Sequence, residues 1–151
     1  MEKTKTVTLS KPAHPKRFVR ETVSFLMEEP GRVAIAEGVP LSGKTEFSLR
    51  CAYHCAARNG ALLISCEEST VAVYNRFFKM FGQKATIRRN ICAITICGKR
   101  TANQICALIA EFPYPVVVID GIDLIGVDLS VLEMLARDTG VSFLATRRIA
   151  K

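Results

Sequence analysis

Long apolar runs are missing from this sequence of 151 residues. No stretch approaches the roughly 18 consecutive apolar residues that a membrane-spanning helix needs. The basic N-terminus is not followed by an apolar region of the signal-peptide type. At 49% hydrophobic residues, the composition is too apolar for a disordered chain. We therefore expect a globular, cytoplasmic protein that makes no contact with a membrane.

Paired cysteine motifs are missing as well. The chain has six cysteines but no C-x-x-C pair, which excludes the common zinc-binding and thioredoxin-like patterns. Most of the cysteines lie in apolar segments, where a thiol behaves as a small hydrophobic group. An intracellular disulfide is the alternative, and the sequence alone does not select a pairing.

Acidic residues are scarce at the N-terminus. Residues 1–20 contain six basic residues and one acid, which gives +5 of the net charge of +7. Such a segment is suited to binding nucleic acid or another polyanion, and a solvated tail explains it equally well. We define residues 1–15 as a basic arm and residues 16–151 as the domain. Within the arm, Lys5–Leu9 alternates like a short strand.

A phosphate-binding pattern follows an apolar segment. Residues 38–45, GVPLSGKT, fit G-x-x-x-x-G-K-[ST]. The glycines let backbone N–H groups turn toward phosphate oxygens, the lysine adds positive charge, and the threonine hydroxyl can bind magnesium. An apolar strand at Val33–Ala36 and a helical pattern over Glu46–Arg58 supply the flanks that this motif requires. The candidate nucleotide-binding residues are Gly38, Pro40, Leu41, Ser42, Gly43, Lys44 and Thr45.

Two further apolar strands end in acidic residues. Ala61–Cys66 is followed by Glu67 and Glu68, and Pro115–Asp120 holds an unbroken β-branched run that ends in Asp120. Ligands of open α/β sheets bind beyond the carboxyl ends of the strands, so at least one of the two glutamates should face the nucleotide. Asp120 has the position of an acid that orients magnesium through its water shell.

The rest of the chain alternates helices and strands, which predicts an α/β fold with a parallel sheet and helices on both faces. Asp123 is expected in the turn after the Asp120 strand. Capping boxes are expected at Thr101 with Gln104 and at Ser130 with Glu133. The other expected elements are helices at Lys16–Glu29 and Thr70–Phe81 and strands at Ile91–Ile96 and Val141–Thr146.

Four segments in this order resemble the RecA-type P-loop ATPases, in particular the branch with the DnaB replicative helicases, bacterial RadA and KaiC. The segments are PGRVAIAEGVPLSGKTEFSL, LLISCEES, VVVIDGIDLI and ATRRI. The resemblance implies a RecA-like P-loop fold with strand order 3-2-4-5-1, counted from the strand before the phosphate loop. It also implies ATP and Mg²⁺ as ligands and assembly into a ring or filament.

The resemblance assigns roles to individual residues. Lys44 and Thr45 hold the phosphates and the metal, and Asp120 is the acid of the magnesium site. Glu67, alone or with Glu68, polarises the attacking water. The γ-phosphate sensor at the tip of the last strand corresponds to Thr146, with Arg147 and Arg148 beside it.

The chain also departs from the family pattern. Leu41 stands where glycine is usual, and Gly121 stands where serine often follows the acid. Family members continue beyond the sensor strand with DNA-contacting loops and with an arginine or lysine finger for the neighbouring subunit. Such a finger is worth about 10³ to 10⁵ in rate in related phosphoryl transfers. We therefore expect weak ATP hydrolysis by this chain alone.

Two classes of function fit these observations. The first is an ATPase that acts in an oligomer, or with a larger RecA-like partner, on nucleic acid in recombination, repair or replication. The second is a non-motor paralogue that binds nucleotide and regulates or scaffolds a partner. Nucleic-acid binding by the basic arm can accompany either class.

Overall fold

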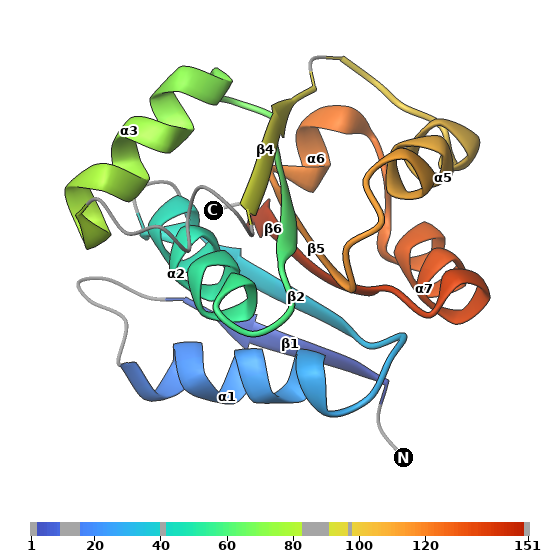
Figure 1. The fold of residues 1–151 in the computed structure, drawn as a ribbon. Coiled ribbons are helices and arrows are strands. Elements are labelled where there is room, and N and C mark those ends of the chain that lie inside the picture. Colours follow the sequence, from blue (N-terminus) through green and yellow to red (C-terminus); the bar gives the residue numbers. More distant parts are fainter. Residues whose placement is uncertain (1–2, 10–15, 40–41, 83–90, 97, 150–151) are drawn as a thin grey trace.

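The computed structural model describes residues 3–9, 16–39, 42–82, 91–96 and 98–149 (Figure 1). Strands and helices alternate along these ranges, as expected for an α/β fold. The elements are β1 (Thr4–Thr8), α1 (Lys16–Glu28), β2 (Val33–Gly38), α2 (Lys44–Ala56), β3 (Ala61–Ser65), α3 (Thr70–Phe81), β4 (Ile91–Thr95), α5 (Ala102–Glu111), β5 (Val116–Asp120), α6 (Ile122–Ile125), α7 (Leu129–Thr139) and β6 (Ser142–Arg148).

All strands belong to one parallel sheet with the order β1-β2-β6-β5-β3-β4. The order expected for the five strands that start with β2 is present within it. β1 adds a further strand at the edge, where the alternating pattern of Lys5–Leu9 predicted a short strand, and it pairs with β2 from Thr4↔Val33 to Thr8↔Glu37. The alternating segment of the basic arm is therefore part of the sheet.

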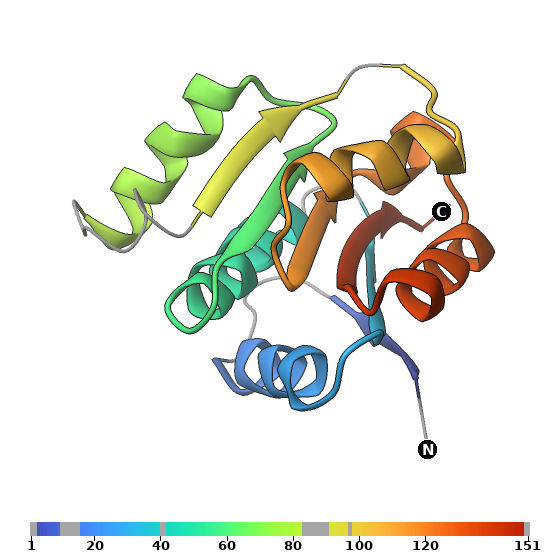
Figure 2. The same ribbon diagram turned by 45° about the vertical axis from the view of Figure 1, so that its right-hand side comes forward.

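Helices cover both faces of the sheet, with α1, α2 and α3 on one face and α5, α6 and α7 on the other (Figure 2). Successive strand residues point to opposite faces. Each face of the sheet therefore has its own core: the first core lies under α1, α2 and α3, and the second lies under α5, α6 and α7. In β2, Ala34 and Ala36 belong to the first core, whereas Val33 and Ile35 belong to the second. Both faces of β2, β3 and β5 are buried, which explains why these strands are continuous apolar runs.

Of the two predicted capping boxes, one is present and the other is wrong. Ser69 caps α3, and Thr101 with Gln104 forms the capping box of α5. The capping box predicted at Ser130 with Glu133 is wrong. Asp128 caps α7 instead, because its carboxylate accepts from the backbone N–H of Val131 at 3.1 Å and also accepts from the Ser130 hydroxyl.

Cys51, Cys55, Cys92 and Cys106 are free thiols, as expected for small hydrophobic side chains. Cys51 and Cys55 are buried in the core between α2 and the sheet. Burial raises the pKa of Cys55 to about 12. Since the thiolate is the reactive form, Cys55 should be chemically inert in the folded protein. Cys97 lies outside the described residues.

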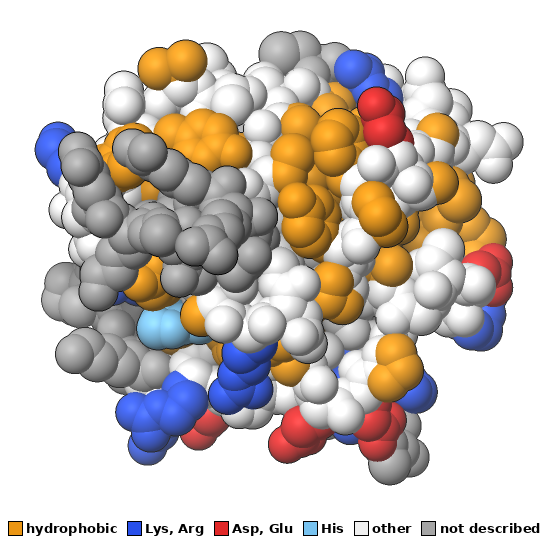
Figure 3. Space-filling model, viewed as in Figure 1, with side chains coloured by type: hydrophobic (Ala, Val, Ile, Leu, Met, Phe, Trp, Pro, Cys, Tyr) orange, Lys and Arg blue, Asp and Glu red, His pale blue; other side chains and the backbone are white. Residues whose placement is uncertain are grey.

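Apolar side chains are exposed along the second edge of the sheet. Among the described strands, β4 pairs only with β3, and its Cys92 and Ile94 are partly exposed. Figure 3 shows hydrophobic side chains gathered over this part of the surface. No helix in the described ranges is both long and apolar enough to cross a bilayer.

β1 covers the opposite edge of the sheet, and two lysines of the basic arm make contacts there. Lys3 forms an ion pair with Glu29 at 3.5 Å, and the ammonium of Lys5 lies 5.8 Å from the centre of the Phe25 ring. Val7 is buried against the first core. Without β1, the backbone of β2 would be an exposed edge of an apolar strand, which invites aggregation.

We expect deletion of residues 1–10 to cause aggregation or a large loss of stability. Val7→Asp should have the same effect by placing a charge in the core, whereas Thr6→Asp, on the exposed side of β1, should be tolerated. Thermal unfolding and light scattering measure both effects. A deletion variant that stays soluble with an unchanged Tm would show that β1 does not protect the edge.

Candidate functional site

A cavity of about 580 Å³ lies at the carboxyl ends of the parallel strands. This is the edge at which open α/β sheets bind their ligands. The lining combines the phosphate-loop motif, the acids after β3 and the ends of β5 and β6. Its residues are Gly43, Lys44, Thr45, Glu46, Glu67, Glu68, Arg76, Gly121, Asp123, Leu124, Thr146 and Arg148.

The two glycines of the motif meet different backbone requirements. A Cβ on Gly38 would lie 2.1 Å from the Ser42 hydroxyl oxygen, so the tight return of the loop leaves no room for a side chain. Gly43 has a φ of 90°, in the left-handed region that favours glycine, and directly precedes α2. The loop therefore delivers the N-terminus of α2 to the cavity. Pro40 and Leu41 lie outside the described residues.

Lys44, the first residue of α2, folds back over the loop. Its ammonium donates to the carbonyl oxygens of Gly38 at 2.9 Å and Val39 at 3.0 Å. Burial and the like charge of Arg148 lower the pKa of Lys44, against the opposing effect of nearby acids such as Asp120. A bound anion would stabilise the charged ammonium against both burial and the charge of Arg148. Its full negative charge would do so more strongly than the two carbonyl dipoles.

The Asp120 carboxylate joins three elements at the bottom of the cavity. Thr45 of α2 donates to its Oδ2 at 2.9 Å, and Thr146 of β6 donates to its Oδ1 at 2.7 Å. The Thr146 hydroxyl in turn accepts from the Gly121 backbone N–H at 2.9 Å. Burial raises the pKa of Asp120, and the two threonine hydrogen bonds oppose that shift. The carboxylate is therefore held in place at an electrostatic cost.

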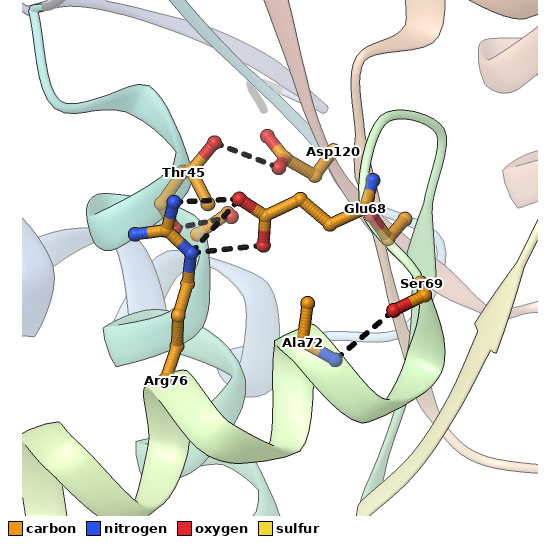
Figure 4. Close-up of polar contacts among 8 residues, drawn as sticks. Thr45, Glu68, Ser69, Ala72, Arg76 and Asp120 are labelled. Atoms are coloured by element: carbon orange, nitrogen blue, oxygen red, sulfur yellow. Dashed lines mark hydrogen bonds and ion pairs between the residues drawn. The ribbon is translucent and has the colours of Figure 1, made fainter.

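The two glutamates after β3 have different surroundings. Glu68 is bound by Arg76 of α3 through three contacts of 2.6 to 2.9 Å, and its backbone N–H donates to the Ser65 hydroxyl. Figure 4 shows this ion pair beside the contact between Thr45 and Asp120. Glu67 lines the cavity and forms no ion pair with any described residue. Of the two, Glu67 is the carboxylate available to a ligand.

The predicted sensor residues separate into two groups. Thr146 and Arg148 line the cavity, but Arg147 does not. The Arg147 Nε donates instead to Glu37 of β2 at 2.6 Å. Asp123, which the sequence assigned to a turn, lies in the short helix α6 and in the cavity wall.

Arg76 is the site residue that the sequence analysis missed. It lies in the middle of α3, and eight positions separate it from Glu68. No short motif marks such a residue. The helical periodicity gives no signal either, because Arg76 lies on the exposed side of α3, opposite Tyr74, Phe77 and Phe81.

The donor set fits a magnesium ion bound together with a nucleotide. Thr45 and Asp120 offer a hydroxyl and a carboxylate oxygen in direct contact, and no group of three or more acidic, histidine or cysteine ligands occurs among the described residues. Mg²⁺ usually takes one or two protein oxygens and completes its shell with substrate phosphates and water.

Comparisons with known proteins support the fold. No protein-family model matches the sequence, and no curated protein sequence matches it. Among solved structures, the chain is similar to the flagellar accessory protein FlaH from Methanocaldococcus jannaschii, with a TM-score of 0.68 and 12% identity. The similarity covers 93% of this chain and 70% of that one. The fold is therefore RecA-like: a single parallel sheet with helices on both faces.

Proposed function

We propose that this domain binds ATP with Mg²⁺ and hydrolyses it slowly. The observation that carries the proposal is the 2.9 Å contact between the Thr45 hydroxyl and the Asp120 carboxylate, which are 75 residues apart in the chain. The contact brings the end of the phosphate-loop motif against the tip of β5, beside Lys44. A hydroxyl, a carboxylate and an ammonium in this arrangement suit the metal and the phosphates of a nucleoside triphosphate.

Binding would use groups that α2 and its loop already orient. The N-terminus of α2 presents backbone N–H groups and the positive end of the helix dipole. Lys44 would exchange its two carbonyl partners, Gly38 and Val39, for phosphate oxygens. Thr45 and Asp120 would hold Mg²⁺, which neutralises negative charge on the phosphates when it is bound.

Hydrolysis requires a base for the attacking water, and we assign this role to Glu67. Water would attack the γ-phosphorus while the bond between that phosphorus and the β,γ-bridging oxygen breaks. A proton of the attacking water would pass to the Glu67 carboxylate. The products are ADP and inorganic phosphate. Glu68 is less suited as a base, because Arg76 binds both of its carboxylate oxygens.

The same ion pair favours a second candidate function. If Glu68 is needed for turnover and stays bound to Arg76, the domain would hold ATP without hydrolysing it and would act as a nucleotide-dependent regulator of a partner. Steady-state turnover of the unmodified protein distinguishes the two candidates, since the regulator would release phosphate no faster than a sample without protein.

Lys44→Ala should weaken ATP binding by about 10- to 100-fold, because one charge-assisted contact to phosphate is lost. The fold should persist, since the ammonium packs against no apolar core. Titration calorimetry measures the affinity and circular dichroism the fold. Lys79→Ala, on the exposed last turn of α3, is the matched control. Equal ATP affinity in the Lys44 variant and the parent would rule out the loop as a phosphate site.

Glu67→Gln should preserve ATP binding and lower turnover by about 10² to 10⁴, the usual contribution of a general base. Glu68→Gln is the matched variant and should retain most of the turnover. Single-turnover phosphate release measures both. The opposite pattern, with turnover lost in the Glu68 variant alone, would transfer the role of base to Glu68.

Asp120→Asn should raise the Tm at pH 7 without ligand and should abolish the Mg²⁺ dependence of ATP binding. Burial raises the pKa of Asp120, so the ionised carboxylate destabilises the folded state above that pKa. Each kcal/mol gained in the free energy of unfolding raises the Tm by about 2–4 °C in a domain of this size. The gain should shrink as the pH falls, because the parent then takes up a proton. Thermal scans from pH 7 down to pH 4, close to the ordinary carboxyl pKa of 3.8, measure it, and a gap that widens toward acid would contradict the assignment.

A further inference from the structure

Two adjacent arginines at the end of β6 have opposite environments. Arg147 is tied to Glu37 on the neighbouring strand, whereas Arg148 lines the cavity together with Thr146. This separation follows from the pleat, since residues 146 and 148 share one side of the strand and residue 147 points to the other. Of the pair, Arg148 therefore lies on the cavity side, together with the phosphate-loop residues Gly43 and Lys44.

The two arginines that line the cavity differ in their ion pairs. Among the described residues, no carboxylate lies within ion-pair distance of Arg148, whereas Arg76 is held by Glu68. The backbone of Arg148 is the register partner of Gly38, the first glycine of the phosphate loop. Its side chain and the Lys44 ammonium line the same cavity. Two cations that face one cavity repel each other until an anion lies between them.

We propose that Arg148 binds the γ-phosphoryl oxygens of ATP within the same chain and stabilises the negative charge that grows on them during hydrolysis. This inference rests on the proposed function. A guanidinium donates in a planar fork that fits two phosphoryl oxygens, and it remains charged at any working pH. The domain would then hold its own transition-state cation, and turnover per chain would not depend on a neighbouring subunit.

The position of Arg148 beside Thr146 points to the γ-phosphate and not to the rest of the nucleotide. Thr146 contacts Asp120, the proposed metal-site acid, so this strand tip would lie next to the terminal phosphate of a bound nucleotide. The cradle for the inner phosphates is formed separately by the loop and the start of α2. An effect of Arg148 on ATP but not on ADP is the expected signature.

The test compares Arg148→Ala with the parent and with Arg137→Ala, a matched control whose side chain is exposed on α7. Affinities for ADP and for a non-hydrolysable ATP analogue are measured by calorimetry, with single-turnover phosphate release beside them. In Arg148→Ala we expect ADP affinity within twofold of the parent, at least a tenfold loss for the analogue and at least a tenfold fall in turnover. Arg137→Ala should match the parent in all three.

A second measurement follows the turnover per chain over a hundredfold range of protein concentration. A constant value is expected. A value that rises with concentration would overturn the assignment by placing the cation on another chain. Equal losses for ADP and for the analogue would overturn the γ-phosphate contact, and so would an Arg148 variant identical to the parent. If the parent binds neither nucleotide, the proposed function itself fails, which is a different result from binding that ignores Arg148.

Discussion

The Asp120 carboxylate is the contact on which the geometry of the site depends. Each of its oxygens accepts a hydrogen bond from a different element, Thr45 at the start of α2 and Thr146 near the end of β6. These bonds fix the phosphate-loop helix relative to the centre of the sheet. Because the carboxylate is buried, its charge is costly without a cation. A cation bound beside this carboxylate would offset that cost.

Most of the fold could be predicted from local patterns. The strands buried on both faces are continuous apolar runs, and strong turn signals such as Gly140 mark where helices end. The predicted start of α7 was wrong because two capping signals overlap. Asp128 and Ser130 are both good caps, and the direction in which the chain leaves α6 decides between them. The alternation of Lys5–Leu9 predicted a short strand, and β1 is that strand.

The site could be predicted only in part. The phosphate loop and Asp120 follow from short motifs at strand ends, where the backbone fixes the direction of the side chain. Neighbouring residues are harder to assign, because one step along a strand reverses the side to which a residue points. The sequence therefore did not separate Arg147 from Arg148. The choice between Glu67 and Glu68 depends on Arg76, which another helix supplies.

The place of β6 in the sheet has a consequence for the order in which the protein assembles. Residues 142–148 insert between β5, the preceding strand in the chain, and β2, which comes much earlier. During synthesis those strands emerge with their inner edges unpaired and their apolar faces incompletely covered. The parallel pairing of β6 with β2 should form slowly, because the chain between these two strands must close a long loop first. The nascent chain should therefore pass through an incomplete sheet with exposed apolar strands. Chaperones that bind such strands should act on it before β6 pairs with β2 and β5.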